Sequence, residues 1–228
     1  MKTIAALFDC DGTLYSAQFG RGLLKYAAEH GRKGAVRAYY AAILLPYTLG
    51  KFGFTDDEKH LRPVIANLAR LVRGMSEQEG GSLFAWVTYE YLLPTQRTDV
   101  ITRLREHQSQ DHAVVLVSGA FVPYLAQLAQ SLNVTGYVGT QLEILNGYYT
   151  GRIIPPVITG CDKYDFTHEF FSSRGLEVDW EASYAYADSS TDLGLMELVG
   201  HPVAVYPDPK LQIHAQEAGW EIIGNGKP

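Results

Sequence analysis

Cysteine is scarce in this chain, which contains two such residues among 228, Cys10 and Cys161. Two cysteines form at most one disulfide, so the chain is not a small scaffold held together by several bridges. The apolar run near the N-terminus is too short for a secretory signal and ends in acidic residues. We therefore expect two reduced thiols and a cytoplasmic protein.

A long apolar run is also missing from the sequence. The most apolar stretch, residues 35–50, contains Arg37 and Pro46 and is shorter than the roughly 20 apolar residues that a spanning helix needs. We interpret this stretch as a buried or interfacial helix. Stable insertion into a membrane is therefore not expected.

Positive charge is too sparse for a protein that binds nucleic acid. The chain has 19 lysines and arginines against 25 acidic residues, and its net charge is -6. A nucleic-acid surface needs clustered cations, so we expect no nucleic-acid partner. A small anion held by one or two local cations remains compatible with this charge. The seven histidines show no ligand spacing such as HxxxH, and no zinc site is predicted.

Short apolar segments alternate with helical patterns over most of the chain. Such segments predict strands at residues 4–8, 113–117, 134–138, 183–187 and 202–205. Ser118-Gly119 is expected to break the second of these strands, and Asn146-Gly147 predicts a hairpin over residues 141–154. The pattern predicts an α/β fold with a doubly wound parallel sheet and helices on both faces.

Residues 16–94 differ from the rest because they show helical periodicity and no strand signal. We interpret them as a helical cap domain inserted after the first strand. The α/β core would then comprise residues 1–15 and 95–228. An insertion at this point lies over the edge where open α/β sheets bind their ligands.

Acidic side chains follow two of the predicted strands. Asp9 and Asp11 follow residues 4–8, while Asp188 ends the later strand and Asp192 comes four residues after it. The carboxyl ends of parallel strands meet in one crevice, where several carboxylates would repel one another. Mg²⁺ relieves such repulsion and prefers oxygen ligands. The sequence therefore predicts a Mg²⁺ site.

Three further groups predict an anion cradle in the same crevice. Ser118 and Gly119 follow a strand, and Lys163 lies near the start of a predicted helix. A hydroxyl, a backbone N–H and an ammonium together suit a phosphoryl group. Asp9 can then attack phosphorus to form an aspartyl-phosphate, and Asp11 can protonate the leaving oxygen and later deprotonate a water.

The motifs FDCDGT, LVSGA, GCDK and AYADSSTD, in that order, resemble the four motifs of the haloacid dehalogenase (HAD) superfamily. The insertion point resembles subfamily IB, the phosphoserine-phosphatase-like group with a helical cap. The resemblance implies that Asp9 is the nucleophile and a metal ligand, and that Asp11 is the acid/base and offers its backbone carbonyl to the metal. It implies that Asp188 is a metal ligand and that Asp192 contacts the metal or its water. The phosphate ligands that it implies are Ser118, Gly119 and Lys163.

We therefore expect a Mg²⁺-dependent phosphatase acting on a small phosphorylated metabolite through an aspartyl-phosphate. Two alternatives stay open: a phosphotransferase that uses an alcohol acceptor, and a non-catalytic phosphate-binding protein on the same scaffold. The resemblance is weak in the cap, so phosphoserine, histidinol phosphate, another amino-alcohol phosphate and a lysophospholipid all remain candidate substrates. A homodimer also stays open.

The cap contains a tyrosine-rich stretch with Tyr39, Tyr40 and Tyr47. Core packing is the simplest interpretation, and an apolar substrate pocket or a dimer face are the alternatives. Cys10 is expected to point into the core, away from the metal. The candidate cations for a second anionic group of the substrate are Arg21, Arg32, Arg37 and Arg62.

Overall fold

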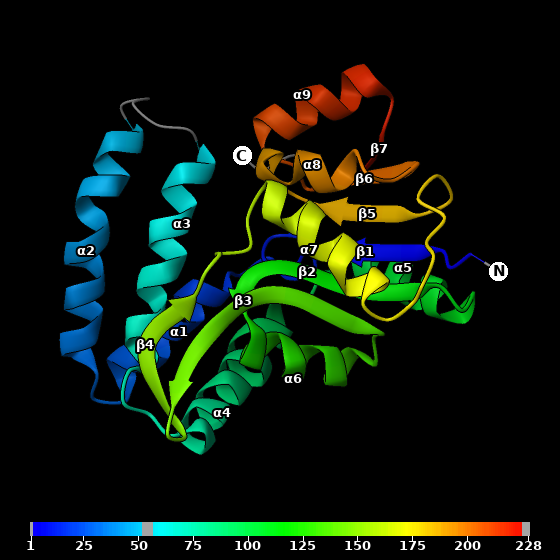
Figure 1. The fold of residues 1–228 in the computed structure, drawn as a ribbon. Helices are drawn as coiled ribbons and strands as arrows, with labels where there is room; N and C mark the ends of the chain where they lie inside the picture. Colours follow the sequence, from blue (N-terminus) through cyan, green and yellow to red (C-terminus); the bar gives the residue numbers. More distant parts are fainter. Residues whose placement is uncertain (1, 52–56, 225–228) are drawn as a thin grey trace.

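The computed structural model describes residues 2–51 and 57–224, apart from the side chains of residues 45–51 and 57–60. Within this part, the predicted α/β fold is confirmed as a seven-stranded sheet of order β4-β3-β2-β1-β5-β6-β7 (Figure 1). Every neighbouring pair is parallel except β3 and β4, which are antiparallel. The strands are β1 (Ala5–Phe8), β2 (Ala113–Phe121), β3 (Gly136–Leu145), β4 (Tyr148–Ile154), β5 (Tyr184–Ala187), β6 (His201–Val205) and β7 (Glu221–Ile223).

Helices cover both faces of the sheet, as its alternating side chains require. In β1, Ala5 and Leu7 join the hydrophobic cluster beneath α7, α8 and α9. Ala6 and Phe8 join a second cluster with α5 and α6 on the opposite face. These core helices are α5 (Thr98–Ser109), α6 (Val122–Leu132), α7 (Cys161–Ser172), α8 (Leu193–Met196) and α9 (Pro209–Ala218).

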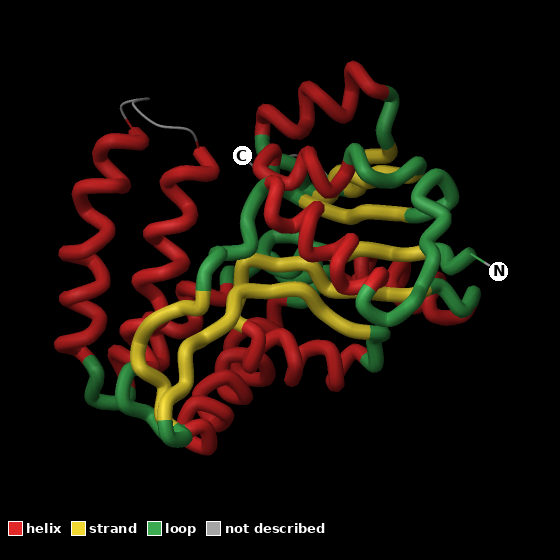
Figure 2. Tube along the Cα trace, viewed as in Figure 1, coloured by secondary structure: helices red, strands yellow, loops and turns green. Residues whose placement is uncertain are grey.

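The segment between β1 and α5 is helical, as predicted. Its α-helices are α1 (Phe19–Glu29), α2 (Lys33–Lys51), α3 (Asp57–Leu68) and α4 (Glu77–Trp86). Figures 1 and 2 show α2 and α3 as an antiparallel pair beside the sheet. By contrast, Leu23 of α1 and Phe84 of α4 belong to the same hydrophobic cluster as Phe8. One part of the insertion therefore packs on the core, while α2 and α3 stand beside it.

Local sequence signals explain where two of these helices begin. Ser76 and Glu79 form a reciprocal capping box at the start of α4, in which each side chain accepts a hydrogen bond from the backbone N–H of the other residue. Asp208 caps α9, whose first residue is Pro209. No helix in residues 2–51 and 57–224 is long and apolar enough to cross a membrane.

The structure differs from the predicted strands in three places. β2 does not break at Ser118-Gly119 but continues to Phe121, with a register shift against β3 in this stretch. The strand expected at residues 134–138 begins at Gly136 and runs on into the predicted hairpin, where Asn146 and Gly147 have the positive φ angles of a tight turn. The sequence analysis also missed β7.

Candidate active site

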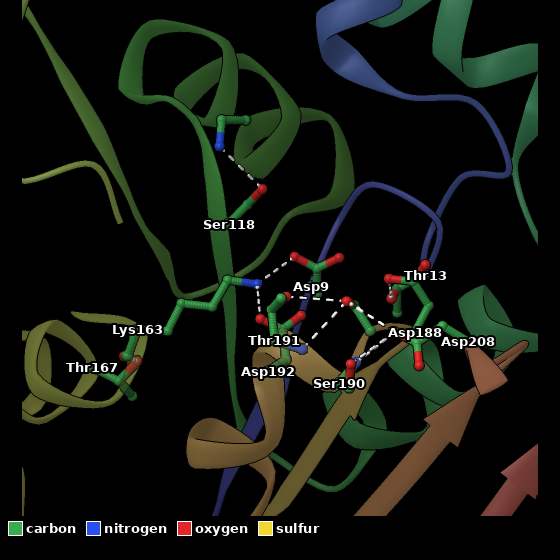
Figure 3. Close-up of polar contacts among 12 residues, drawn as sticks. Asp9, Thr13, Ser118, Lys163, Thr167, Asp188, Ser190, Thr191, Asp192 and Asp208 are labelled. Carbon is green, nitrogen blue, oxygen red and sulfur yellow. Dashed lines mark hydrogen bonds and ion pairs between the residues drawn. The ribbon is translucent and has the colours of Figure 1, made fainter. Parts of the chain in front are cut away.

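Side chains from three neighbouring strands and one helix converge at the carboxyl edge of the sheet. Figure 3 shows Asp9 directly after β1, with Ser118 of β2 above it and Asp188 beside it after β5. Lys163 reaches the same point from α7, and Asp192 approaches from the turn that follows Asp188. The structure thus brings together residues that are up to 183 positions apart because β1 lies between β2 and β5.

Three carboxylates form a compact cluster in this crevice. One oxygen each from Asp9, Asp188 and Asp192 lies within 4.8 Å of the others, and all three residues are buried. Burial is the main cause that raises the pKa of Asp192 above its usual value; the charge of Lys163 opposes this shift, and the charges of Asp9 and Asp188 add to it. A cluster of this composition fits a hard divalent cation, which would offset the repulsion between the carboxylates.

Lys163 contributes a positive charge to this cluster. Its Nζ lies 2.7 Å from Asp9 Oδ1 and 2.7 Å from Asp192 Oδ1. Burial lowers the pKa of Lys163, but the charges of Asp192 and Asp9 outweigh this effect and raise it. The ammonium therefore stays protonated. One ammonium leaves three carboxylates incompletely compensated, which again suits an additional cation.

Asp11 occupies a different position from the other three acids. Both of its carboxylate oxygens accept a hydrogen bond from the Phe19 N–H at 2.9 Å, at the start of α1. Burial raises the pKa of Asp11 to about 7, although the hydrogen bond from Phe19 lowers it in part. The side chain still lines the same cavity as Asp9. Its backbone carbonyl as a metal ligand stays a prediction.

The turn after Asp11 holds Asp188 in place. A Cβ on Gly12 would lie 2.1 Å from Asp188 Oδ2, and Gly12 has a φ of +88°. Both facts require glycine at this position. Thr13 Oγ1 donates a hydrogen bond to Asp188 Oδ1 at 3.3 Å.

Ser118 and Gly119 lie within β2, in the stretch where its register against β3 shifts, and they line the cavity with Asp9. Ser118 is buried, and its Oγ accepts a hydrogen bond from the Ala120 N–H at 3.2 Å. A Cβ on Gly119 would lie 3.2 Å from the Ile158 carbonyl and 3.0 Å from Ile65 Cδ1. A glycine here allows the neighbouring chain and the inserted helix α3 to approach the strand closely.

Asp208 is a supporting residue that the sequence analysis missed. Its Oδ2 accepts hydrogen bonds from the Ser190 N–H at 2.7 Å and the Ser189 hydroxyl at 3.2 Å. Its own N–H donates to the Asp188 carbonyl at 2.8 Å. Asp208 therefore fixes the turn that carries Asp188 and Asp192. The Asp-Pro pair signals a helix start, but nothing in the sequence signals these contacts across the fold.

Thr159 is a second residue that the sequence analysis missed. It is 3 % exposed, and its hydroxyl has no hydrogen-bond partner among the described residues. The side chain lines the cavity, and Thr159 Cγ2 would lie 3.7 Å from a Cβ on Gly119. An unpartnered hydroxyl in this place is available to a bound anion.

A cavity of about 540 Å³ connects these groups to α1, α2 and α3. Of the four predicted arginine candidates, Arg21 lines the cavity and the other three do not. Arg62 instead forms an ion pair with Asp162 across α3 and α7, with Nη2 2.7 Å from Oδ2. Cys10 is fully buried in the hydrophobic core, as predicted. The side chain of Tyr47 lies outside the described residues.

Comparisons with known proteins agree with this geometry. The family model described as haloacid dehalogenase-like hydrolase matches residues 6–197. The chain is 30% identical over 227 residues to phosphoserine phosphatase SerB1 of Mycobacterium tuberculosis, covering 96% of this chain and 70% of that protein. It is 28% identical to a histidinol-phosphatase of Neisseria meningitidis, covering 98% and 99% of the two chains.

A solved structure supports the fold independently. A Bordetella pertussis protein described as having unknown function superimposes with a TM-score of 0.84 at 24% identity. The match covers 98% of this chain and 99% of that one. The two folds therefore agree over almost their whole length, including the helices inserted after β1.

Proposed function

Because the chain belongs to the haloacid dehalogenase-like hydrolases, we propose that it is a Mg²⁺-dependent phosphatase that forms a phosphoenzyme on Asp9. It hydrolyses phosphoric monoesters, which is the reaction given in the names of two relatives, a phosphoserine phosphatase and a histidinol-phosphatase. The observation that carries the mechanism is the buried contact of Asp9 with Lys163 beside Ser118 (Figure 3). This contact places the proposed nucleophile, Asp9, next to the groups proposed to bind the phosphoryl oxygens.

The cradle would hold the phosphoryl group before any bond changes. The ammonium of Lys163, the hydroxyl of Ser118 and the N–H of Gly119 would contact its oxygens. The buried Thr159 hydroxyl offers a further donor. Because Ser118, Gly119 and Lys163 are held by β2 and α7, little reorganisation is needed when charge develops on the phosphoryl oxygens.

Asp9 would then attack phosphorus with a carboxylate oxygen. A bond forms between Asp9 and phosphorus while the bond from phosphorus to the alcohol oxygen breaks. Asp11 donates a proton to that oxygen, so the product leaves as a neutral alcohol. A water next attacks phosphorus and gives its proton to Asp11. The bond between the Asp9 oxygen and phosphorus breaks in this step, which yields inorganic phosphate and the free Asp9 carboxylate.

The carboxylate cluster would hold Mg²⁺ through Asp9 and Asp188, with the backbone carbonyl of Asp11 as a further ligand. Asp192 would contact the ion or a water bound to it. Bound there, the ion supplies positive charge against the phosphoryl oxygens. The three buried carboxylates within 4.8 Å support this assignment. We further propose that residues 16–94 act as a cap domain, because α1, α2 and α3 supply the cavity wall that faces Asp9.

The mechanism is tested by Mg²⁺-dependent hydrolysis of a small aryl phosphate. Asp9→Asn should reduce turnover to background, because the amide is a poor nucleophile. Asp165→Asn is the matched control, since Asp165 lies exposed on α7 and should leave the rate unchanged. Wild-type hydrolysis by a folded Asp9→Asn enzyme would refute the proposed role of Asp9.

A further inference from the structure

The cavity above Asp9 is polar and charged on one side and mostly apolar on the other. Its floor contains the carboxylates, the Ser118 hydroxyl and Lys163. The opposite wall comes from α1, α2 and α3 and is mostly apolar or aromatic. Side chains of this apolar wall include Leu24, Tyr40, Ile43, Leu61, Val64 and Ile65.

The apolar wall begins directly beside the phosphate cradle. Ile65 Cδ1 of α3 would lie 3.0 Å from a Cβ on Gly119, the glycine of the cradle. One turn later on the same helix, Leu68 Cδ1 would lie 2.9 Å from a Cβ on Gly20. The first carbon atoms of a leaving group would therefore meet aliphatic side chains as soon as they emerge from the phosphoryl group.

The charges of this wall do not suit an amino-acid phosphate. Gln18 and Arg21 are its strongly polar members, and no carboxylate among the described cap side chains lines the cavity. Among the described cap side chains, an ammonium group on the substrate would lose water without meeting a carboxylate, which is costly. Methylene groups would gain about 0.8 kcal/mol each on burial. The wall thus favours carbon chains over charged amines.

The apolar wall also reaches the protein surface. Tyr40 of α2 is 55% exposed and Leu61 of α3 is 40% exposed, although both line the cavity. These helices run side by side at the edge of the molecule (Figure 1). At about 540 Å³ the cavity has the size of an organic-ligand site and is much larger than a phosphoryl group. A chain of several carbons could extend between α2 and α3 toward solvent.

Resting on the phosphatase activity proposed above, we propose that the substrate is a phosphomonoester of an alcohol that carries an apolar chain. The phosphoryl group binds at Asp9 and Lys163. The chain lies along the apolar wall and passes between Tyr40 and Leu61. Burial of the chain, rather than recognition of an amino group, sets the specificity of the site.

A series of alkyl phosphates tests this substrate class. We would measure kcat/KM with Mg²⁺ for ethyl, butyl, hexyl and octyl phosphate as monomers, and for phosphoserine. The expected kcat/KM rises by about fourfold for each methylene that becomes buried, and phosphoserine falls below butyl phosphate. Equal values across the series, or a preference for phosphoserine, would overturn the inference while leaving the phosphatase intact. Absence of hydrolysis of every compound would instead refute the proposed function itself.

Two substitutions on α2 locate the chain. Tyr40→Ser should lower the ratio of kcat/KM for octyl over ethyl phosphate by about tenfold, since it removes one apolar side of the exit. Leu44→Ser is the matched control, because Leu44 is 63% exposed one turn away and does not line the cavity. It should leave the ratio unchanged. An unchanged ratio in Tyr40→Ser, or equal losses in both variants, would contradict the proposed path of the chain.

Discussion

The ammonium of Lys163 lies 2.7 Å from Asp9 Oδ1, and both side chains are almost completely buried. The same nitrogen is 2.7 Å from Asp192 Oδ1, so one cation bridges two acids that come from separate elements. A buried charge of this kind is stable mainly while its partners are present. The contact therefore links the stability of the apo protein to the residues proposed to bind phosphate.

Lys163→Met should destabilise the protein in the absence of metal. Losing the ammonium leaves the buried carboxylates uncompensated, which costs about 3–5 kcal/mol in comparable sites. Urea unfolding with a chelator measures this change. The double variant with Asp192→Asn should recover part of the loss, since it removes one of the stranded charges. Equal stability of Lys163→Met and wild type would contradict a compensating role for Lys163.

Thr159→Val should weaken substrate binding without harming the fold. The two side chains are nearly the same size, and the hydroxyl has no hydrogen-bond partner among the described residues. If that hydroxyl donates to the phosphoryl group, its removal costs about 0.5–1.5 kcal/mol, or roughly two- to twelvefold in kcat/KM. The expected thermal unfolding midpoint does not fall. An unchanged kcat/KM would show that the hydroxyl does not contact the substrate.

Asp208→Ala should affect both stability and turnover. Loss of the helix cap on α9 costs about 1 kcal/mol. The contacts to Ser189 and Ser190 disappear as well, so the turn carrying Asp188 and Asp192 loses its support. Asp208→Asn is the comparison variant because asparagine is also a good cap. Urea unfolding and kcat should both be closer to wild type in Asp208→Asn, and the reverse order would contradict this role.

His107 should make stability depend on pH below neutrality. It is buried, with Nε2 2.9 Å from the Tyr186 hydroxyl and Nδ1 2.8 Å from His112. Burial, followed by the charges of His112 and Arg103, lowers the pKa of His107 to about 4. The unfolded chain, with a histidine pKa near 6.5, binds more protons between these values. Stability is therefore lost as pH falls from about 6.5 to about 4.

A His107→Gln variant isolates this contribution from that of the carboxylates. Urea midpoints measured at pH 7, 5.5 and 4.5 should fall less steeply in the variant than in wild type. The variant is expected to be less stable at pH 7, since the contacts to Tyr186 and His112 change. Parallel pH profiles for the two proteins would show that His107 does not titrate as inferred.

The parallel arrangement of the core made much of the site predictable from the sequence. Asp9 and Asp188 each follow a short apolar strand, and the carboxyl ends of parallel strands meet by construction. Ser118 reaches the same edge from the neighbouring strand β2, whereas Lys163 comes from the first turn of α7. Their spacing in the sequence is irrelevant once the strand order places β1 between β2 and β5.

Features that depend on close packing were not predictable in this way. Gly119 resembles a strand break, yet it is a strand residue that Ile65 and Ile158 approach closely. Gly139 similarly resembles a strand break in the sequence. It is a residue of β3, and a Cβ at this position would lie 2.9 Å from the Ala120 carbonyl oxygen. Asp208 contacts a turn 18 positions earlier in the sequence. Each of these roles is set by neighbours from other elements, which local patterns do not encode.

The measurement that tests the central claim most directly is the identification of the phosphorylated residue. Wild-type enzyme turning over an aryl phosphate with Mg²⁺ would be quenched rapidly in acid, digested and mapped by mass spectrometry. We predict a phosphoryl group on the peptide that contains Asp9, and none on that peptide in Asp9→Asn. A phosphoryl group on any other residue, or full turnover by the Asp9→Asn enzyme, would contradict the account.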